Sequence, residues 1–113
     1  MHHTSKLDLP FAGISRRFVG ADQGDVAISA FLVDAPPGRG AVPHRHPYDT
    51  VAFVQAGRGT WTVNGASREA GPGDILVVKA GEVHHFTNSG EEVLVLVDVH
   101  LGPRFEQENL GPA

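Results

Sequence analysis

The sequence predicts an all-β protein that folds as a sandwich or a barrel. Glycine and proline, 14 and 8 of the 113 residues, are distributed along the chain and separate short apolar runs. These runs have the length of strands, and none of them repeats with the 3.6-residue period of an amphipathic helix. Short apolar segments between regularly spaced turn signals are typical of antiparallel sheets that pack face to face or close on themselves.

Three strands are predicted in the first half of the chain, at residues 14–19, 26–35 and 50–56. The segment 20–24, which contains two glycines, ends the first strand. Pro36 and Pro37 stop the second, because proline lacks the amide hydrogen that a continuing strand would use for pairing. Gly57 ends the third strand.

Four strands are predicted in the second half, at residues 59–63, 66–69, 75–78 and 93–101. Asn64 and Gly65 join the first two strands as a hairpin, because both central positions of a type I′ turn need positive φ, which these residues adopt readily. A tight turn at 71–74 leads into the third strand, and a turn at 88–90 leads into the last. The polar C-terminal region is expected to hold a short helical turn at 105–109.

The last predicted strand has two different faces. Its odd positions are uniformly apolar, and we expect them to pack against the core: Val93, Val95, Val97 and Val99. Its even positions change from leucine to Asp98 and His100, so the opposite face becomes polar toward the end of the strand. We expect this second face to point into a polar cavity, toward a dimer partner or into water.

Composition predicts a single domain, residues 1–113, with an arm at 1–13, a barrel core at about 14–101 and a tail at 102–113. The net charge is −4 and the basic residues are scattered, so no basic surface for a nucleic acid is expected. No apolar run reaches the length of a membrane span, and the chain has no cysteine for a disulfide or a thiolate ligand. We expect a cytoplasmic protein with neither nucleic-acid nor membrane partners.

Three histidines are the main functional signal. His44 and His46 have an i, i+2 spacing, which in a strand places both side chains on one face. His84 follows forty residues later, after a turn and an apolar strand. Neutral imidazole is a ligand for zinc, iron, nickel, copper and manganese, and three such ligands leave a coordination position open for reaction. His85 should face away from His84.

The residues around these histidines resemble the two sequence motifs of the cupin family. The first motif, a glycine, His-x-His, a glutamate and a glycine, corresponds in order and spacing to Gly38, His44, His46, Thr50 and Gly57. The second corresponds to Gly73, the turn Lys79-Ala80-Gly81, His84 and Asn88. The resemblance implies a double-stranded β-helix barrel of the jelly-roll type. It also implies that His44, His46 and His84 bind one divalent metal ion inside the mouth of the barrel.

Two positions depart from the motifs. Thr50 stands where the family usually has its glutamate ligand, and a neutral hydroxyl is a poor ligand. Asp49 precedes it and would point to the opposite face of a regular strand, unless a bulge re-aims it. A site of three histidines keeps the full +2 charge of its metal and is therefore a stronger Lewis acid than a site that also contains a carboxylate. The three-histidine dioxygenases of the family resemble this ligand set. Lys79, in place of proline, is expected to alter a turn at the barrel edge.

Further residues are candidates for chemistry beside the metal. Asp98 and His100 share a face and form the candidate catalytic pair, in which the carboxylate orients the imidazole. Two alternatives for His100 are a fourth metal ligand that replaces the missing acid, and a histidine at an interface. Thr50, Tyr48 and Phe86 are the candidate residues of a substrate pocket.

Two classes of function remain open from the sequence. The first is a metal-dependent enzyme that acts on a small oxygen-rich organic molecule, such as a diketone, an enol or a hydroxy acid. With iron it would be a dioxygenase, and with zinc, nickel or manganese an isomerase or cyclase that uses Lewis acidity. The second is a non-catalytic small-ligand-binding or sensor protein. In both cases we expect a homodimer to which residues 7–19 contribute, since pairing covers an exposed sheet edge.

Overall fold

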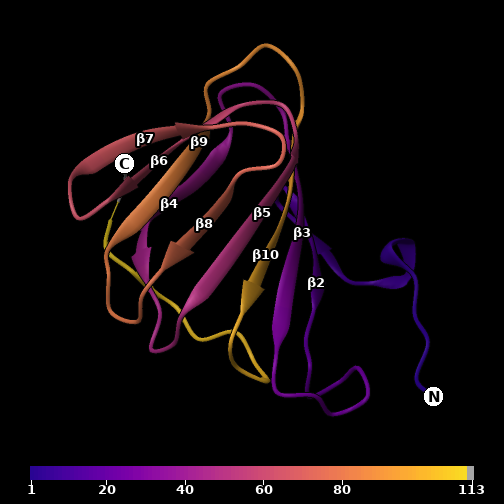
Figure 1. Ribbon diagram of the computed structural model, residues 1–113. Helices are drawn as coiled ribbons and strands as arrows, with labels where there is room; N and C mark the ends of the chain where they lie inside the picture. The colour runs from indigo at the N-terminus through magenta and orange to yellow at the C-terminus, as the bar shows by residue number, and fades with distance from the viewer. Residues whose placement is uncertain (112–113) are drawn as a thin grey trace.

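The computed structural model of the chain describes residues 1–111, which fold into two antiparallel sheets that face each other (Figure 1). The elements are η1 (Lys6–Asp8), β1 (Phe11–Ala12), β2 (Ser15–Phe18), β3 (Ser29–Ala35), β4 (Gly40–Arg45), β5 (Thr50–Ala56), β6 (Gly59–Val63), β7 (Ala66–Ala70), β8 (Ile75–Val78), β9 (His84–Asn88), β10 (Leu94–His100) and β11 (Glu108–Asn109). The predicted all-β fold is confirmed, and the predicted strands at 50–56, 59–63 and 75–78 have the observed bounds.

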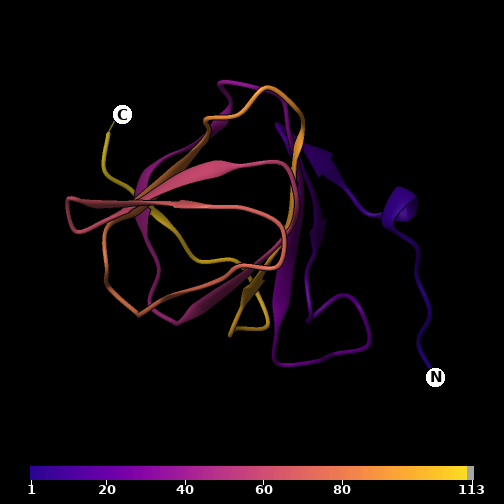
Figure 2. The ribbon, with the colours of Figure 1, turned by 45° about the horizontal axis from the view of Figure 1, so that its top comes forward.

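The order of the strands is that of a jelly roll. One sheet has six strands in the order β1-β2-β3-β10-β5-β8, and the other has five in the order β11-β4-β9-β6-β7. From β3 to β11 the chain alternates between the two sheets, apart from the β6–β7 hairpin. Figure 2 shows the sheets curving around a common interior, with η1 and the N-terminal arm outside the barrel. The predicted jelly-roll barrel is therefore confirmed, although within residues 1–111 no hydrogen-bonded strand pair joins the two sheets.

Two turns contain residues with positive φ, which explains the choice of asparagine and glycine there. Asn64 and Gly65 have φ values of 49° and 84°, as the predicted type I′ hairpin requires. Gly57 ends β5 with φ of 80°, and a Cβ atom there would lie 2.5 Å from the carbonyl oxygen of Val93. A larger residue at this position would be strained both in its own backbone and against the neighbouring chain.

The interior of the barrel is apolar at one end. Strand β10 contributes to this core with the face that is opposite to the predicted one. Leu94 and Leu96 are 0% and 1% exposed and belong to the core, whereas Val93 is 47% exposed and the other odd positions are half-buried on the outer face. β10 lies between β3 and β5, so its inward face contributes both to the core and to the polar cavity. The predicted burial of the valine face is therefore wrong, whereas the polar cavity expected as one alternative for the even face is confirmed at Asp98 and His100.

The predicted strand at 14–19 is confirmed as β2, which is preceded by the short strand β1. Two other expectations about the chain differ from the structure. β3 begins at Ser29 rather than at residue 26. The predicted helical turn at 105–109 is wrong, because Glu108 and Asn109 form β11 and pair with β4. Strand pairing available only in the folded chain decides the conformation of this polar segment.

The outer face of the six-stranded sheet carries exposed apolar side chains. Phe53, Ile75 and Val77 are 41%, 60% and 60% exposed, and Phe53 lies directly opposite Ile75 in the β5–β8 pair. Contiguous apolar surface of this kind is typical of protein interfaces, and the homodimer remains a prediction. Among residues 1–111, no helix is long and apolar enough to span a membrane.

The observed orientation of β10 leads to a stability prediction. Leu96→Ala should lower the free energy of unfolding by about 2–5 kcal/mol, because it removes a fully buried side chain. Val97→Ala, on the half-buried outer face, should cost less than about 1.5 kcal/mol. Urea denaturation of both variants measures the difference. A larger loss for Val97→Ala would contradict the observed orientation.

Candidate metal centre

The structure brings the three predicted histidines together. His44 on β4 lies directly opposite His84 on β9, and His46 follows immediately after the end of β4. All three are buried, with 4–6% of each residue exposed. One nitrogen from each ring can be chosen such that these atoms lie within 4.8 Å of one another. Pairing of two strands far apart in sequence thus assembles a three-histidine group that could hold a metal ion.

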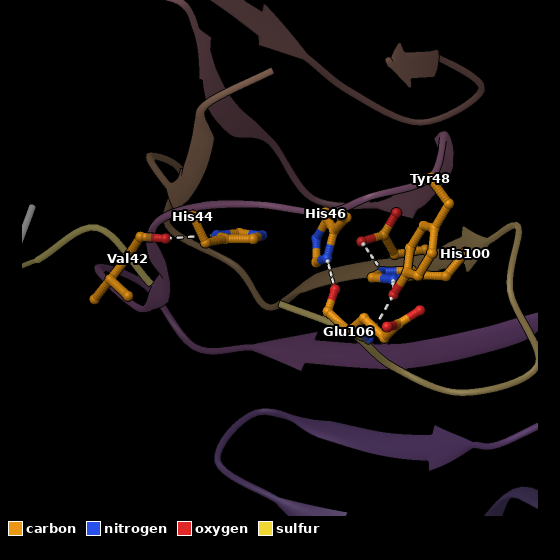
Figure 3. A network of polar contacts seen from close by, with 7 residues as sticks. Val42, His44, His46, Tyr48, His100 and Glu106 are labelled. Atoms are coloured by element: carbon orange, nitrogen blue, oxygen red, sulfur yellow. Dashed lines mark hydrogen bonds and ion pairs between the residues drawn. The ribbon is translucent and has the colours of Figure 1, made fainter. Parts of the chain in front are cut away.

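Backbone carbonyl groups orient all three imidazole rings. The Nδ1 atoms donate hydrogen bonds as follows: His44 to the carbonyl of Val42 at 2.6 Å, His46 to that of Glu106 at 2.8 Å, and His84 to that of Glu82 at 2.9 Å. Figure 3 shows the first two bonds. Because a carbonyl oxygen only accepts, each Nδ1 carries the hydrogen and each Nε2 has a free lone pair. Fixed tautomers of this kind are typical of metal-binding histidines.

The residues fit a bound cation. Nε2 of His46 is buried and has no hydrogen-bond partner among residues 1–111. A buried nitrogen lone pair without a donor is rare in proteins, and coordination of a metal would satisfy it. Three neutral nitrogen donors are also a suitable set for a divalent transition metal with open coordination positions.

Burial keeps two of these imidazoles neutral. Burial lowers the pKa of His46 to about 4, although the hydrogen bond to the Glu106 carbonyl acts in the opposite direction. Burial also lowers the pKa of His44, against the effect of the bond to the Val42 carbonyl. At neutral pH both rings are therefore deprotonated, and a metal ion would not have to displace protons from them.

A second polar group lies beside the histidines. His100 is 1% exposed, and its ring centroid is 4.6 Å from that of His46. Its Nδ1 accepts a hydrogen bond from the Tyr48 hydroxyl at 2.8 Å, and its Nε2 donates to the carboxylate of Asp98 at 3.2 Å. Burial raises the pKa of Tyr48, so its hydroxyl stays a donor. Both nitrogens of His100 are hydrogen-bonded, one to Tyr48 and one to Asp98, and its role as a catalytic residue stays a prediction.

A cavity of about 240 Å³ borders several of these groups. Its wall includes His44, His84, Asp98 and His100. Of the predicted pocket residues, Thr50 and Phe86 also line it. Tyr48 is not among its lining residues, and its hydroxyl bonds to the ring of His100. Sequence reasoning missed four further polar residues of the wall, namely Ser15, Arg17, Arg39 and Gln107.

One of the two departures from the motifs, Lys79, pairs with Asp49 on the surface, whereas the other, Thr50, is buried. Asp49 accepts hydrogen bonds from Lys79 Nζ at 2.6 Å and from the backbone amide of Ala80 at 2.9 Å, and the bond from Lys79 lowers its pKa. The carboxylate of Asp49 is thus held by the turn before β9 and does not replace the missing acidic ligand. Arg45, which stands between His44 and His46, forms an ion pair with Glu108. His85, next to His84, is not part of the three-histidine group.

Comparisons with known proteins agree with this architecture. A family profile described as the cupin domain matches residues 31–100. The comparison with curated proteins gives no match. Among solved structures, oxalate decarboxylase from Lactobacillus farciminis is 23% identical, with a TM-score of 0.79 over 92% of this chain and 34% of that chain. A structure of oxalate oxidase is 21% identical, with a TM-score of 0.80 over 96% of this chain and 63% of that chain.

A third structure matches this chain over nearly the whole length of both chains. It is an uncharacterized protein with a double-stranded β-helix domain from Klebsiella pneumoniae, 23% identical, with a TM-score of 0.77 over 96% of both chains. In contrast, this chain spans about a third of the Lactobacillus farciminis decarboxylase. At these identities the likeness establishes the fold.

The lowered pKa values predict how stability depends on pH. The imidazole of His46 titrates near 6.5 when unfolded and near 4 when folded, so below pH 6.5 the unfolded chain takes up a proton that the folded chain refuses. The free energy of unfolding of the metal-free protein should be highest above pH 6.5. It should decrease by roughly 1–3 kcal/mol as the pH falls toward 4.

Urea denaturation of the metal-free protein at pH 7.5 and at pH 4.5 measures this loss. His46→Gln removes the titrating ring and should reduce the difference between the two pH values. An equal difference in the variant would show that other groups cause the pH dependence.

Proposed function

This chain belongs to the cupin family, and on that premise we propose that it is a metal-dependent enzyme that acts on a small, oxygen-rich organic molecule. The observation that carries the proposal is the set of three buried imidazoles with their Nδ1 atoms bonded to carbonyls and their Nε2 atoms free. The unpartnered Nε2 of His46 supports this assignment, because a bound cation would satisfy its lone pair. The proposed ligands are His44, His46 and His84.

The chemistry of the metal would follow from its neutral ligand set. A divalent ion, whether iron, zinc, nickel or manganese, would act as a Lewis acid toward a substrate oxygen, and iron would add reactivity with dioxygen. Thr50, at the position of the family's usual glutamate, is 3% exposed and lines the cavity. Because Thr50 is uncharged, the site would keep a charge of about +2 and would attract an anionic substrate oxygen.

The cavity wall supports an anionic substrate. Arg17 and Arg39 line the cavity, and neither forms an ion pair with a carboxylate among residues 1–111. Guanidinium groups bind carboxylates with two parallel hydrogen bonds. The cavity volume of about 240 Å³ limits the substrate to a small molecule. Two of the similar structures are oxalate enzymes, and one of the Bacillus subtilis decarboxylase structures concerns its Mn(II) centers, so oxalate and manganese belong in the first tests.

Asp98 and His100 are the proposed acid–base residues. The Asp98 carboxylate lines the cavity and is 3.2 Å from His100 Nε2, while Tyr48 holds the other nitrogen. This arrangement fixes the orientation of the imidazole and places a carboxylate beside the substrate space. Proton transfer to or from the substrate would therefore take place at Asp98, with His100 as its hydrogen-bonded partner.

Metal binding is tested with two neighbouring histidines. His84→Ala should lower the bound metal from about one equivalent to near zero and weaken zinc affinity at least tenfold, because one of three ligands is lost. His85→Ala, next to it on β9, should keep full binding. Elemental analysis and zinc titration of tag-free protein provide the measurement. Equal metal content in the two variants, or none in the wild type, would contradict the proposal.

Activity is tested on the metal-loaded wild type. We expect the protein loaded with iron or manganese to consume oxygen or to convert one class of small molecule. The classes to be tested are oxalate, hydroxy acids, diketones, enols, thiols and catechols. Asp98→Asn should lower kcat on the order of 10²–10⁴-fold without loss of metal, because the base is removed. A ligand that binds the metal-loaded protein but is never converted would favour the non-catalytic binding or sensor function.

A further inference from the structure

Residues 103–110, which we name the strap, lie along the ligand strand β4 and pass the metal-binding histidines. Only Phe105 in this segment is half-buried, and the remaining side chains are exposed. The strap ends in β11, which pairs with β4 through Glu108 opposite Arg45 and Asn109 opposite His44. A surface segment with so little buried area is held by a small number of contacts, and several of these contacts are with the site itself.

The main-chain groups of one strap residue, Glu106, hold two parts of the site. Its carbonyl oxygen accepts the Nδ1 hydrogen of His46 at 2.8 Å. Its amide donates to the Tyr48 hydroxyl at 3.1 Å, and that hydroxyl in turn donates to His100 at 2.8 Å. Figure 3 shows Glu106 between His46 on one side and the Tyr48–His100 pair on the other. The other two metal-binding histidines bond to carbonyls only two residues away in their own segments, whereas His46 depends on a residue sixty positions later.

Three contacts position this residue. The Phe105 ring stacks on Phe31 with centroids 4.1 Å apart and meets the edge of His100 at 5.2 Å. Arg45 donates two hydrogen bonds, of 3.0 and 3.1 Å, to the carboxylate of Glu108. These contacts lie on either side of Glu106 and fix where its carbonyl and amide point.

We propose that the strap is a positioning element of the metal centre: its docking sets the ring of His46 for coordination, and metal binding in turn stabilises the docked strap. The inference rests on the proposed metal site. With the strap undocked, His46 would lose its fixed tautomer and orientation, and Tyr48 and His100 would lose their common support. Because two linked equilibria affect each other equally, a metal that requires the docked strap must also favour docking.

The strap also carries Gln107, which lies at the cavity. Its side chain lines the cavity that contains His44 and His84, and it is carried there by the strap. Docking therefore completes one wall of the substrate space as well as the support of His46.

The test uses three strap variants and zinc as the probe. Phe105→Ala removes the anchor and should weaken zinc affinity roughly tenfold, a typical result of losing support for a metal ligand. Glu108→Gln removes the ion pair with Arg45 and should weaken zinc affinity roughly two- to fivefold. Glu106→Gln is the charge-matched control, because it removes one acidic charge from the strap but leaves the backbone groups that hold His46 and Tyr48. It should bind zinc more tightly than Glu108→Gln.

Hydrogen exchange measures the reverse effect. Two strap amides are bonded in the folded chain, that of Glu106 to Tyr48 and that of Leu110 to the Pro43 carbonyl. Zinc should slow exchange in peptides that cover the strap in the wild type and in Glu106→Gln, but less in Phe105→Ala. The turn at 71–74 serves as an internal reference, because it follows the end of β7 that lies away from His84. Its amides of Gly73 and Asp74 are bonded to the carbonyls of Val54 and Gly71.

The outcomes separate the two proposals. If the wild type binds no zinc, the metal site itself is wrong. If it binds zinc but Phe105→Ala binds equally tightly and strap exchange does not respond to zinc, the metal site stands and the strap proposal is overturned. Weaker binding in Phe105→Ala together with zinc-dependent protection in the wild type supports the strap proposal.

Discussion

The pairing of β4 with β9 is the constraint on which the rest of this molecule depends. Their register places His44 opposite His84, and the continuation of β4 brings His46 to the same point. Each ring is then held by a carbonyl at Nδ1, so the three Nε2 atoms are left without internal partners by the backbone itself. A one-residue slip of either strand would turn these side chains to the other face, so the site and the sheet form together.

The barrel interior combines a core and a reactive space within one small volume. Leu94 and Leu96 pack in the core, while Asp98 and His100 on the same face of β10 border the cavity. Two of the buried polar side chains there are supported by hydrogen bonds: His100 lies between Tyr48 and Asp98, and Asn88 donates to the carbonyls of Ala35 and Glu92. Within residues 1–111, Nε2 of His46 is by contrast fully buried without a hydrogen-bond partner. Such an atom is where a bound group is expected, because unpaired buried polar atoms destabilise a fold unless a ligand or metal satisfies them.

Some features could be predicted from the sequence because they depend on local chemistry. Asn64-Gly65 specified its turn through backbone conformation alone, and the i, i+2 spacing of His44 and His46 placed both on one side of the ligand strand. Other features could not be predicted in this way. The valine face of β10 was wrongly assigned to the core, since an unbroken row of valines fits the half-buried outside of a sheet as well as a core. The strap was expected to be helical, because no local signal in residues 105–109 indicates pairing with a strand sixty positions earlier.

The sequence by itself determined the all-β class, most of the strands and turns, the jelly-roll resemblance and the identity of the three clustered histidines. These follow from periodicity, turn chemistry and motif spacing, which are properties of short stretches of chain. Only the tertiary structure decided that Asp49 binds Lys79, that Tyr48 supports His100, and that Arg17, Arg39 and Gln107 reach the cavity. Such contacts join residues far apart in sequence, and their geometry exists only once the two sheets have closed over a common interior.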